Sequence, residues 1–242
     1  MKVEIWSDVV CPWCHVGKRR FEAALTRFAH QDQVEVRWKS FQLDPSASSA
    51  ATTDETRTTD YAQRLAAKYG TSVESAAKMV DSMTKAAAHE GLDFRFDRAV
   101  RANTFDAHQV IHLAVEHGRQ DAVKERLLRA YFSEGEGVGD RETLVRLAAE
   151  VGLPADEVRK SLAEQRFAAA VRTDEAEATA LGIRAVPFFV VDRTYGVSGA
   201  QPPEVLLQVL ERAWSESRPP TLVAAVCTGG SDAGCGPDGC AV

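Results

Sequence analysis

The chain has 242 residues, of which 45% are hydrophobic and 26% are charged, a composition typical of a soluble globular protein. Its length suffices for one large domain or for a domain with a big insertion. The net charge of -6 argues against nucleic acid as the main partner and gives no support for binding an anionic membrane, because both need a basic surface. No apolar run approaches the length of a transmembrane span.

The N-terminus shows no targeting signal. Met1 and Lys2 lead straight into a short apolar strand pattern at residues 3–6, with neither an apolar h-region nor an A-x-A cleavage site. We therefore expect a cytoplasmic protein. Its five cysteines are too few for a disulfide scaffold, and in a reducing compartment paired cysteines are more often catalytic or metal-binding than structural.

The sequence Cys11-Pro12-Trp13-Cys14 follows this strand pattern. Two thiols at C-x-x-C spacing lie within one helical turn and can close into a disulfide. A helix that begins at Pro12 places proline where its missing N–H costs nothing, and it leaves Cys11 at the N-cap. Free backbone N–H groups and the positive end of the helix dipole then favour the thiolate, the attacking species in disulfide exchange.

An alternative interpretation is that the two cysteines are half of the ligands of a zinc site. Such a site needs a second C-x-x-C pair, and the chain has none. In a cytosolic chain with a β-α-β pattern, redox chemistry is therefore favoured. We predict that Cys11 is the exposed nucleophile, that the more buried Cys14 resolves the mixed disulfide, and that the site uses no metal and no cofactor.

The first 43 residues give a β-α-β pattern. A helix with a mostly apolar face is expected over residues 12–30, and the alternation over residues 34–39 predicts a half-buried strand. A polar loop follows to residue 59. Residues 58–182 then carry no convincing strand but several helix patterns, which end at glycines or begin at capping residues. The first three are a helix over about 59–69, a helix that follows the capping box 71–74 and stops near Gly91, and a helix capped by Asn103. The next four are a helix through residues 123–135, one capped by Asp140, one that begins at Pro154, and one over 165–181.

Strand patterns return near the C-terminus. The apolar run 185–191, a turn at 192–194 and residues 195–198 predict a hairpin, and Pro202-Pro203 opens a final helix. The order β-α-β, helices, β-β-α indicates an α/β fold in which a thioredoxin-like core is interrupted by a large all-helical insertion. The expected domains are 1–44 with 183–218 as the discontinuous core, 45–182 as the insertion, and 219–242 as a flexible tail that contains cysteines.

Three segments occur in order within this pattern: the C-P-W-C motif after Ser7-Asp8, the run Ala185-Val186-Pro187, and the sequence Ser-Gly-Ala-Gln at residues 198–201. On these segments the chain resembles the DsbA-like thioredoxin superfamily, and more closely its FrnE-type branch, over essentially residues 1–218. The resemblance implies a thiol-disulfide oxidoreductase with oxidase or isomerase activity on protein substrates. It also implies a cis peptide bond before Pro187.

The same resemblance assigns a substrate-binding role to the backbone of Val186, turned toward the two thiols, and to Pro12 and Trp13. An extended peptide could pair with that backbone, and Trp13 would offer it an apolar surface. The simpler alternatives are that Trp13 is a solvent-facing anchor and that Pro187 is a proline of an edge strand.

Several polar residues near the motif have structural alternatives as well. Asp8 either relays protons beneath the thiols or caps the turn before them. His15 could supply some charge near the thiols and the basic run 18–20 could help the thiolate, but a solvated helix face is favoured for both. His108 and His112 lie four residues apart on one helix, a spacing that can bind metal, but no H-E-x-x-H motif surrounds them, so solvation or packing is favoured.

The tail contains the other three cysteines, Cys227, Cys235 and Cys240. Cys235 and Cys240 form a C-x4-C pair around Gly-Pro-Asp-Gly, a turn that could bring their sulfurs together. We predict a second redox pair that exchanges with the first. Three thiolates of a zinc site, lacking a fourth ligand, are one alternative, and incidental cysteines in a disordered tail are another.

Two further classes of function compete with a protein disulfide oxidoreductase. A glutathione-dependent isomerase or kappa-type glutathione transferase shares the architecture, but such relatives usually carry serine in place of Cys11 and lack the second thiol. A non-enzymatic metal binder is the third class. The expected partners are protein substrates with thiols or disulfides and an electron donor such as thioredoxin or glutathione, with no nucleic acid and no membrane.

Overall fold

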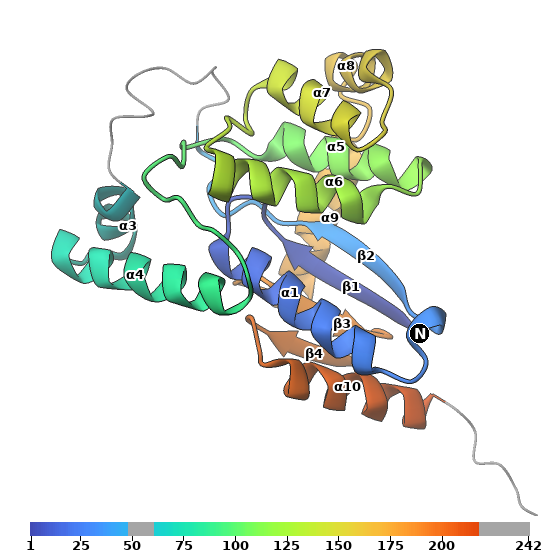
Figure 1. Ribbon diagram of the computed structural model, residues 1–242. Coiled ribbons are helices and arrows are strands. Elements are labelled where there is room, and N and C mark those ends of the chain that lie inside the picture. Colours follow the sequence, from blue (N-terminus) through green and yellow to red (C-terminus); the bar gives the residue numbers. More distant parts are fainter. Residues whose placement is uncertain (48–60, 218–242) are drawn as a thin grey trace, which may run out of the picture.

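The computed structural model describes residues 1–47 and 61–217. Its sheet consists of β1 (Lys2–Ser7), β2 (Glu35–Ser40), β3 (Phe188–Val191) and β4 (Tyr195–Ser198). The strands lie in the order β2-β1-β3-β4 (Figure 1). β1 runs parallel to β2 and antiparallel to β3, and β3 pairs antiparallel with β4. This arrangement confirms the predicted β-α-β start and the hairpin near the C-terminus.

The two central strands, β1 and β3, are the most buried strands of the sheet and consist mainly of apolar residues. β1 pairs on both edges, and residues 3–7 are all buried. β3 begins three residues later than the apolar run 185–191 predicts. Pro187 has no N–H to donate to the ladder, so regular pairing with β1 starts at Phe188, which lies opposite Trp6.

Two helices accompany the sheet on one side. α1 (Pro12–Arg27) and α10 (Pro203–Glu216) pack against each other, and α10 also contacts β3 and β4. Figure 1 shows α1 crossing in front of the sheet, while α9 (Ala168–Ala180) passes behind it and contacts β2. α1 ends at Arg27, before the predicted limit of residue 30, and a short 3-10 helix, η1 (Gln31–Gln33), leads into β2.

The described part of the segment between β2 and β3 is all-helical, as predicted. The prediction that these helices end at glycines is confirmed. Gly135, for example, has a left-handed backbone with φ of 72° directly after the last turn of its helix. The elements of this segment are α3 (Tyr61–Tyr69), α4 (Val73–His89), α5 (Phe105–Glu116), α6 (Gln120–Arg129), the π-helical turn η2 (Ala130–Glu134), α7 (Arg141–Glu150), α8 (Ala155–Ala163) and then α9.

Side-chain caps fix several of these helix starts. Asp140 accepts a hydrogen bond from the Thr143 N–H, and Asn103 accepts one from the first N–H of α5. The capping box predicted at residues 71–74 is wrong by one residue, because the N-cap is Ser72 and its hydroxyl accepts from the Ser75 N–H. A short polar side chain at the N-cap satisfies one of the N–H groups that a helix start leaves free.

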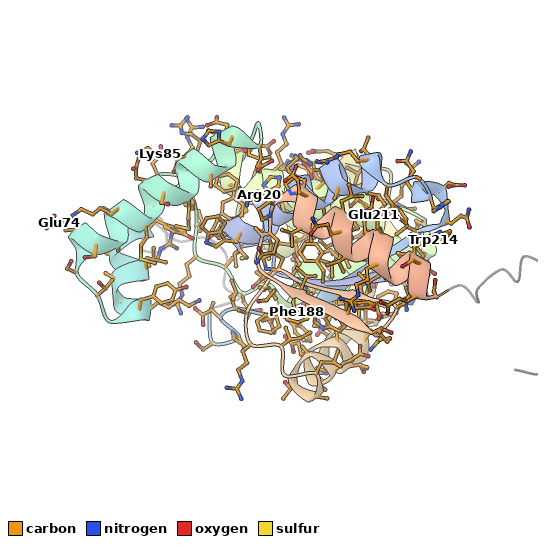
Figure 2. All side chains as sticks on the ribbon, turned by 90° about the horizontal axis from the view of Figure 1, so that it is seen from below. Arg20, Glu74, Lys85, Phe188, Glu211 and Trp214 are labelled. Atoms are coloured by element: carbon orange, nitrogen blue, oxygen red, sulfur yellow. The ribbon has the colours of Figure 1, made fainter. Side chains whose placement is uncertain are left out.

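α3 and α4 form an arm that reaches past the sheet (Figure 2). Glu74 and Lys85 point away from the body on the solvent side of α4, and both are exposed. Arg20 of α1 holds the base of this arm: its Nε donates to Glu90 Oε1 at 2.7 Å, and its Nη1 donates to the carbonyl of Ala200. One side chain thus joins α1, the end of α4 and the approach to α10.

One apolar cluster runs through both the sheet and the helical segment. Val3 of β1, Leu127 of α6, Leu144 of α7 and Leu210 of α10 all belong to it. The division of the chain into a discontinuous core and an insertion domain stays a prediction, since the two parts share their largest core. No helix within the described ranges is long and apolar enough to cross a bilayer.

Candidate active site

The Cys-Pro-Trp-Cys motif lies at the end of the loop that connects β1 to α1 and in the first turn of α1. The turn after β1 is closed by a hydrogen bond from the Cys11 N–H to the carbonyl of Asp8. Cys11 is the N-cap with extended backbone (φ -94°, ψ 114°), and Pro12 is the first residue of the helix. This is the predicted geometry, and it brings two free thiols to the positive end of the helix dipole.

Both sulfurs are less accessible than expected. Cys11 is 4% exposed and Cys14 is fully buried, so the prediction of an exposed Cys11 is wrong. The cause is an apolar cluster that includes Trp6, Ile183 and Val186 and covers the start of α1. Cys11 is still the outer of the two thiols, which keeps it as the candidate for first contact with a substrate.

Trp13 lies between the two cysteines and is 38% exposed, the solvent-facing position that the sequence analysis considered. Its ring is therefore available at the surface beside the buried thiols. Pro12 is buried, and its part in the site is to begin α1 directly after Cys11.

The segment before β3 faces the outer thiol. The Val186–Pro187 peptide bond is cis, as the resemblance implies. The Cys11 thiol donates to the carbonyl oxygen of Val186 at a sulfur-to-oxygen distance of 3.5 Å. On the other side, the carbonyl of Pro187 accepts a hydrogen bond of 2.8 Å from the Gly199 N–H, which fixes the loop. The structure thus brings together residues that lie more than 170 positions apart in the sequence.

Gly17 is a site residue that the sequence analysis missed. A Cβ added at this position would lie 2.8 Å from Cγ of Pro187, closer than real Cβ contacts allow. A glycine inside a helix is unfavourable by roughly 0.5–1 kcal/mol relative to alanine, so its presence in α1 needs a reason. Here it lets the Pro187 ring approach the helix that carries the thiols. The only signal in the sequence is a glycine in the middle of a helix pattern.

The two thiols titrate as a pair. The hydrogen bond with Cys14, together with burial, holds the pKa of Cys11 well above its ordinary value. Burial also acts to raise the pKa of Cys14, but the hydrogen bond from Cys11, the charge of Lys124 and hydrogen bonds with Ser7 and the Asp8 backbone outweigh it, and the pKa of Cys14 is lowered. The first proton of the dithiol therefore leaves readily and the second is held to high pH.

Because the two sulfurs are coupled, these shifts describe the dithiol as a pair: one proton is lost more readily than the other. The assignment of Cys11 as the attacking thiolate at the helix start stays a prediction. Cys11, the less buried of the two, remains the candidate nucleophile.

Asp8 is a buried carboxylate behind the motif, and it does not cap α1 with its side chain. Its Oδ2 accepts a 2.8 Å hydrogen bond from the Leu43 N–H, and His108 Nε2 of α5 lies 3.4 Å from its Oδ1. Burial acts to raise the pKa of Asp8, but His108 and the Leu43 N–H outweigh it and hold that pKa below its ordinary value. The partner found for Asp8 is thus a histidine from the helical segment.

His112, one turn after His108, points to different partners. Its Nε2 lies 3.0 Å from Asp174 Oδ2 and 3.1 Å from the Ser40 hydroxyl. The described residues contain no cluster of metal-binding side chains. The two histidines therefore pack against different carboxylates instead of converging on one metal.

The expectation of a solvated face at His15 and at residues 18–20 is wrong for its most important members. The side chains of His15 and Lys18 are each 1% exposed. Lys18 Nζ pairs with Glu22 of its own helix and with Asp121 and Glu125 of α6, the last two at 3.3 and 3.1 Å. The reason is that Asp121 and Glu125 of α6, about 100 residues later in the chain, reach this face of α1.

His15 follows Cys14 directly but supplies no positive charge of its own. Its ring lies near Phe94 and Phe132, with centroid distances of 5.7 and 6.2 Å, and its Nε2 is 3.5 Å from Glu125. Burial lowers the pKa of His15. A neutral ring among phenylalanines is a packing residue, so the charge near Cys14 has to come from elsewhere.

Lys124 of α6 is the second site residue that the sequence analysis missed. It is 1% exposed, and Cys14, Asp8 and Cys11 are among the charges that act on it. In the sequence it stands inside a helix pattern between Val123 and Leu127, both buried. The sequence does contain one indication that Lys124 is buried, which is its place between apolar residues of a helix pattern.

The predicted second redox pair lies outside the described residues. Cys227, Cys235 and Cys240 all fall after residue 217, so their pairing stays a prediction.

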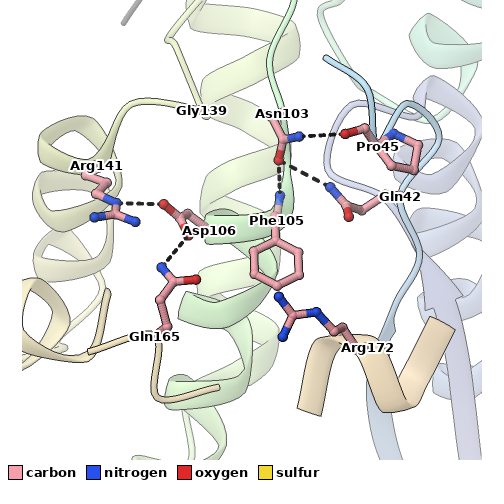
Figure 3. A pocket seen from close by; sticks show the side chains of 9 residues that line it. All are labelled: Gln42, Pro45, Asn103, Phe105, Asp106, Gly139, Arg141, Gln165 and Arg172. Carbon is pink, nitrogen blue, oxygen red and sulfur yellow. Dashed lines mark hydrogen bonds and ion pairs between the residues drawn. The ribbon is translucent and has the colours of Figure 1, made fainter. Parts of the chain in front are cut away.

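A hollow of about 430 Å³ lies beside the start of α5 (Figure 3). Its polar groups are largely paired with each other: Arg141 donates to Asp106 at 2.7 Å, and the Asn103 amide donates to the carbonyl of Pro45 at 3.1 Å. The residues that line it carry no thiol. They are Gln42, Pro45, Asn103, Phe105, Asp106, Gly139, Arg141, Gln165 and Arg172.

Comparison with known proteins agrees with this geometry. The chain is 47% identical to a probable DsbA oxidoreductase from Streptomyces coelicolor, with a TM-score of 0.83 over 100% of this chain and 99% of that one. YwbO of Bacillus subtilis (strain 168), an uncharacterized protein, is 29% identical over 199 residues, which are 79% of this chain and 87% of YwbO.

A more distant structure shares the fold. The cytosolic disulfide reductase DsbM from Pseudomonas aeruginosa is 18% identical, with a TM-score of 0.61 over 89% of this chain and 100% of that one. The model of the DSBA-like thioredoxin domain family matches residues 2–211. This match covers the sheet, both thiols, the cis proline and the helical segment. The chain therefore belongs to the DSBA-like thioredoxin domain family.

Proposed function

We propose that the chain catalyses thiol-disulfide exchange on protein substrates, as an oxidoreductase that also isomerises disulfides. The observation that carries this proposal is the contact between the Cys11 thiol and the carbonyl of Val186, 3.5 Å apart, with the second thiol one turn inward. A backbone edge beside a nucleophilic sulfur suits a substrate cysteine in an extended peptide, because the peptide can pair with the backbone while its sulfur meets Cys11.

When the enzyme acts as a reductant, the exchange proceeds in two steps. The dithiol loses one proton to water, and the Cys11 thiolate attacks one sulfur of the substrate disulfide, which forms a mixed disulfide and releases a substrate thiolate. Cys14 then loses its proton to that thiolate and attacks Cys11. The products are a Cys11–Cys14 disulfide and a substrate with both cysteines reduced: two electrons and one proton have moved from the enzyme to the substrate, and the second substrate thiolate takes its proton from water.

Isomerisation uses the first step and its reversal. The mixed disulfide forms at Cys11, a different substrate thiolate displaces Cys11, and the enzyme returns to the reduced dithiol with no net transfer of electrons. Trp13 supports this role, since its exposed ring offers apolar area to an unfolded chain next to the reacting sulfur. In this proposal Pro12, Trp13 and Val186 bind the substrate, while Cys11, Cys14 and Pro187 form the reacting centre.

The cytoplasm is the proposed compartment. Glutathione and thioredoxin keep thiols reduced there, so either one can serve as the electron donor that regenerates the dithiol. The likeness in fold to a protein named a cytosolic disulfide reductase supports this placement. We further propose that Cys235 and Cys240 form a second dithiol that exchanges with the first, because a chain segment tethered to the same molecule reaches a high effective concentration at the site.

The experiment compares Cys11→Ser with Cys14→Ser in insulin reduction and in refolding of scrambled ribonuclease. Cys11→Ser should reduce both activities to background, and Cys14→Ser should accumulate mixed disulfides that appear as covalent adducts on non-reducing gels. Full activity of Cys11→Ser would contradict the proposal. A glutathione-dependent isomerase or transferase would instead keep its activity in Cys14→Ser, because its chemistry needs no second thiol.

The tail is tested separately by changing Cys235 and Cys240 together to serine. The first dithiol should still react with small thiols, while turnover with a protein substrate should change. Unchanged turnover, with both tail thiols free under oxidant, would leave the tail without a part in the cycle. Stoichiometric zinc on the tail thiols would assign them to metal binding.

A further inference from the structure

The loop between β4 and α10 is bonded to the segment that faces Cys11. Its Gly199 N–H donates to the carbonyl of Pro187 at 2.8 Å, so the loop holds the residue next to Val186. Gly199 has a left-handed backbone with φ of 81°, which a glycine adopts without strain. The Val186 carbonyl lies 3.5 Å from the Cys11 sulfur, and its position therefore depends on how firmly this loop is fixed.

One face of α1 holds this loop. A Cβ added at Gly17 would lie 2.8 Å from Cγ of Pro187 and 3.5 Å from Cβ of Ala200, so the helix backbone closely approaches both. Arg20 follows about one turn later on the same face of the helix. Its Nη1 donates to the carbonyl of Ala200 at 2.6 Å. The helix that carries the thiols therefore holds the loop by packing at Gly17 and by a charge-assisted hydrogen bond from Arg20.

The second partner of Arg20 comes from the arm formed by α3 and α4. The Arg20 Nε donates to Glu90 Oε1 at 2.7 Å, and Glu90 is the C-cap of α4. Figure 2 shows Arg20 between the end of α4 and the start of α10. The side chains of Arg20 and Glu90 are only 22% and 19% exposed, so water screens this pair less than it screens the ion pairs of the outer surface.

A guanidinium is suited to bind both acceptors at once. It is planar and presents its N–H donors in a rigid fork, so fixing one N–H group fixes the direction of the others. Because Glu90 binds the Nε of Arg20, the Nη1 of the same group is directed at the Ala200 carbonyl. The carboxylate at the end of the arm thus orients the hydrogen bond that holds the loop.

We propose that Arg20, oriented by Glu90 of the arm, positions the backbone edge that receives the substrate peptide. This inference rests on the proposed exchange with protein substrates at the two cysteines. The path runs from Glu90 through Arg20 to Ala200, and the neighbouring Gly199 then holds Pro187. Arg20 is a positioning residue in this scheme, because it acts through the loop and touches neither the sulfurs nor the substrate.

The proposal concerns binding of the substrate more than the chemical step. An extended peptide pairs best with backbone groups that are already in place, because an ordered edge reduces the entropy lost on binding. Attack on a bound disulfide requires Cys11 and not Arg20. Loss of the hydrogen bonds of Arg20 should therefore raise the KM for a protein substrate and leave kcat nearly unchanged.

The experiment compares Arg20→Met, Glu90→Gln and the double variant with the unaltered protein. Methionine keeps much of the length of Arg20 and removes its donors, and glutamine keeps the size of Glu90 and removes its charge. Arg27→Met is the matched control, because Arg27 also belongs to α1 and its Nη1 pairs with Glu204 of α10 at 2.8 Å. The first readout is hydrogen exchange at the Gly199 amide, measured by NMR against the amides of β1, which report global unfolding.

In Arg20→Met we expect the Gly199 amide to exchange roughly tenfold faster relative to the β1 amides, the effect of losing one hydrogen bond to a charged group. Glu90→Gln should give a smaller acceleration, roughly threefold, and it serves if Arg20→Met does not fold. The double variant should exchange like Arg20→Met, because Glu90 acts through Arg20.

Arg27→Met should leave the relative exchange at Gly199 as it is in the unaltered protein. An acceleration in Arg27→Met equal to that in Arg20→Met would overturn the proposal. So would an unchanged Gly199 amide in Arg20→Met, or an effect of Glu90→Gln that persists in full when Arg20 is already replaced.

The second readout is insulin reduction. The KM of Arg20→Met for insulin should rise roughly fivefold while kcat changes less than about twofold. An arginine that only joins α1 to the arm would give the same KM as Arg27→Met. A fall in kcat at constant KM would contradict a role in positioning the substrate edge.

The two proposals can fail separately. If the cysteines did not exchange with protein substrates, the unaltered protein would not reduce insulin, while the Gly199 amide would still report on Arg20. If insulin is reduced and the Gly199 amide does not respond to Arg20, only the positioning assignment fails.

Discussion

The sheet with α1 and α10 and the helical segment from α3 to α9 contribute different groups to the site. The first region supplies both sulfurs, the Val186 carbonyl and the exposed Trp13, the groups that meet a substrate. The second region supplies basic side chains, His108 of α5 and Lys124 of α6, both fully enclosed. One region therefore supplies the groups that can meet a substrate, and the other supplies buried basic side chains, of which His108 lies 3.4 Å from Asp8.

The helical segment does more than bury the apolar face of the sheet, because it also supplies a partner for a buried charge. Asp8 belongs to the sheet region, and its histidine partner belongs to the helical segment. Without that segment a buried carboxylate and a buried dithiol would face no basic group. Removing one member of a buried pair is strongly destabilising, because the remaining charge has lost both water and partner. The two regions are thus joined by charges as well as by apolar packing.

A group of ion pairs between α1 and α6 also joins the two regions. Lys18 pairs with Asp121 and Glu125, and Arg19 pairs with Glu125. The ion pairs at the outer surface of the helical segment are different. Arg159 and Glu142, for example, are each about half or more exposed, and pairs of this kind contribute about 0–1 kcal/mol.

The largest expected effect tests whether the two regions unfold together. Leu127 of α6 is 1% exposed within the cluster that also holds residues of β1. Leu127→Ala should lower the free energy of unfolding by about 2–5 kcal/mol, through lost burial and the cavity that remains. Urea unfolding followed by tryptophan fluorescence and by circular dichroism should give one transition in both probes.

Leu181→Ala is the control, since this leucine is 48% exposed and its loss should cost less than about 0.5 kcal/mol. Two separate transitions in Leu127→Ala, with the sheet region melting as in the unaltered protein, would break the comparison. The helical segment would then be an independent domain, whose charges reach the site only by docking.

The next effect concerns the pair that bridges the regions, Asp8 and His108. Asp8→Asn keeps the shape but removes the negative charge, so the Leu43 N–H loses a charged acceptor and His108 loses the carboxylate 3.4 Å away. Hydrogen bonds to charged groups contribute about 1.5–3 kcal/mol, and the variant should lose a similar free energy of unfolding at neutral pH.

The pH dependence supplies the control for this prediction. The folded-state pKa of Asp8 is lowered, so its stabilising contribution is present above the unfolded-state pKa of about 3.9 and is lost as the pH falls through the folded value. The stability gap between the unaltered protein and Asp8→Asn should therefore close below about pH 4. A gap that stays constant down to pH 2.5 would show that Asp8 acts through shape alone.

A smaller effect lies wholly within the sheet region, at the contact of α1 with the cis proline. Alanine in place of a helical glycine normally stabilises by about 0.5–1 kcal/mol. In Gly17→Ala the new Cβ would press on the Pro187 ring, an overpacking cost of about 1–3 kcal/mol, so the sign should reverse to a net loss of about 1 kcal/mol. Thermal unfolding measures the sign, and a stabilised Gly17→Ala protein would show that the ring can move aside.

Local patterns were enough to predict much of this fold. The helix ends at Gly91 and Gly135, the cap at Asp140 and the start of α1 at Pro12 depend on residues within one turn of each other. The roles of Cys11 and Cys14 were predicted from the C-x-x-C spacing and that of Pro187 from the resemblance, and the structure brings Cys11 to the backbone before Pro187. Such features need no knowledge of which elements pack together.

The errors have a common cause, which is packing between distant segments. Lys18 and His15 look solvated from α1 alone, and they are buried because α6 covers that face. Lys124 is missed for the same reason, since its partners lie on the sheet region more than 100 residues earlier. The burial of Cys11 depends on Ile183 and Val186, which sequence spacing cannot place beside it.

The smallest effect on stability is expected at Trp13, a solvent-exposed residue of the sheet region. Its replacement should instead change the KM for a protein substrate. Because its ring is 38% exposed, Trp13→Ala should change the free energy of unfolding by less than about 0.5 kcal/mol. If the ring binds apolar segments of unfolded substrates, KM for insulin should rise roughly fivefold, equivalent to about 1 kcal/mol of binding.

Trp13→Phe is the matched variant, since it keeps an aromatic surface at the same place and should restore most of the affinity for insulin. Reaction of the dithiol with a small disulfide should be the same in all three proteins, because a small disulfide has no chain to rest on the ring. Equal losses with insulin and with the small disulfide would mean that Trp13 shapes the thiols themselves. The division between a region that meets the substrate and a region that supplies buried basic side chains would then have to be redrawn.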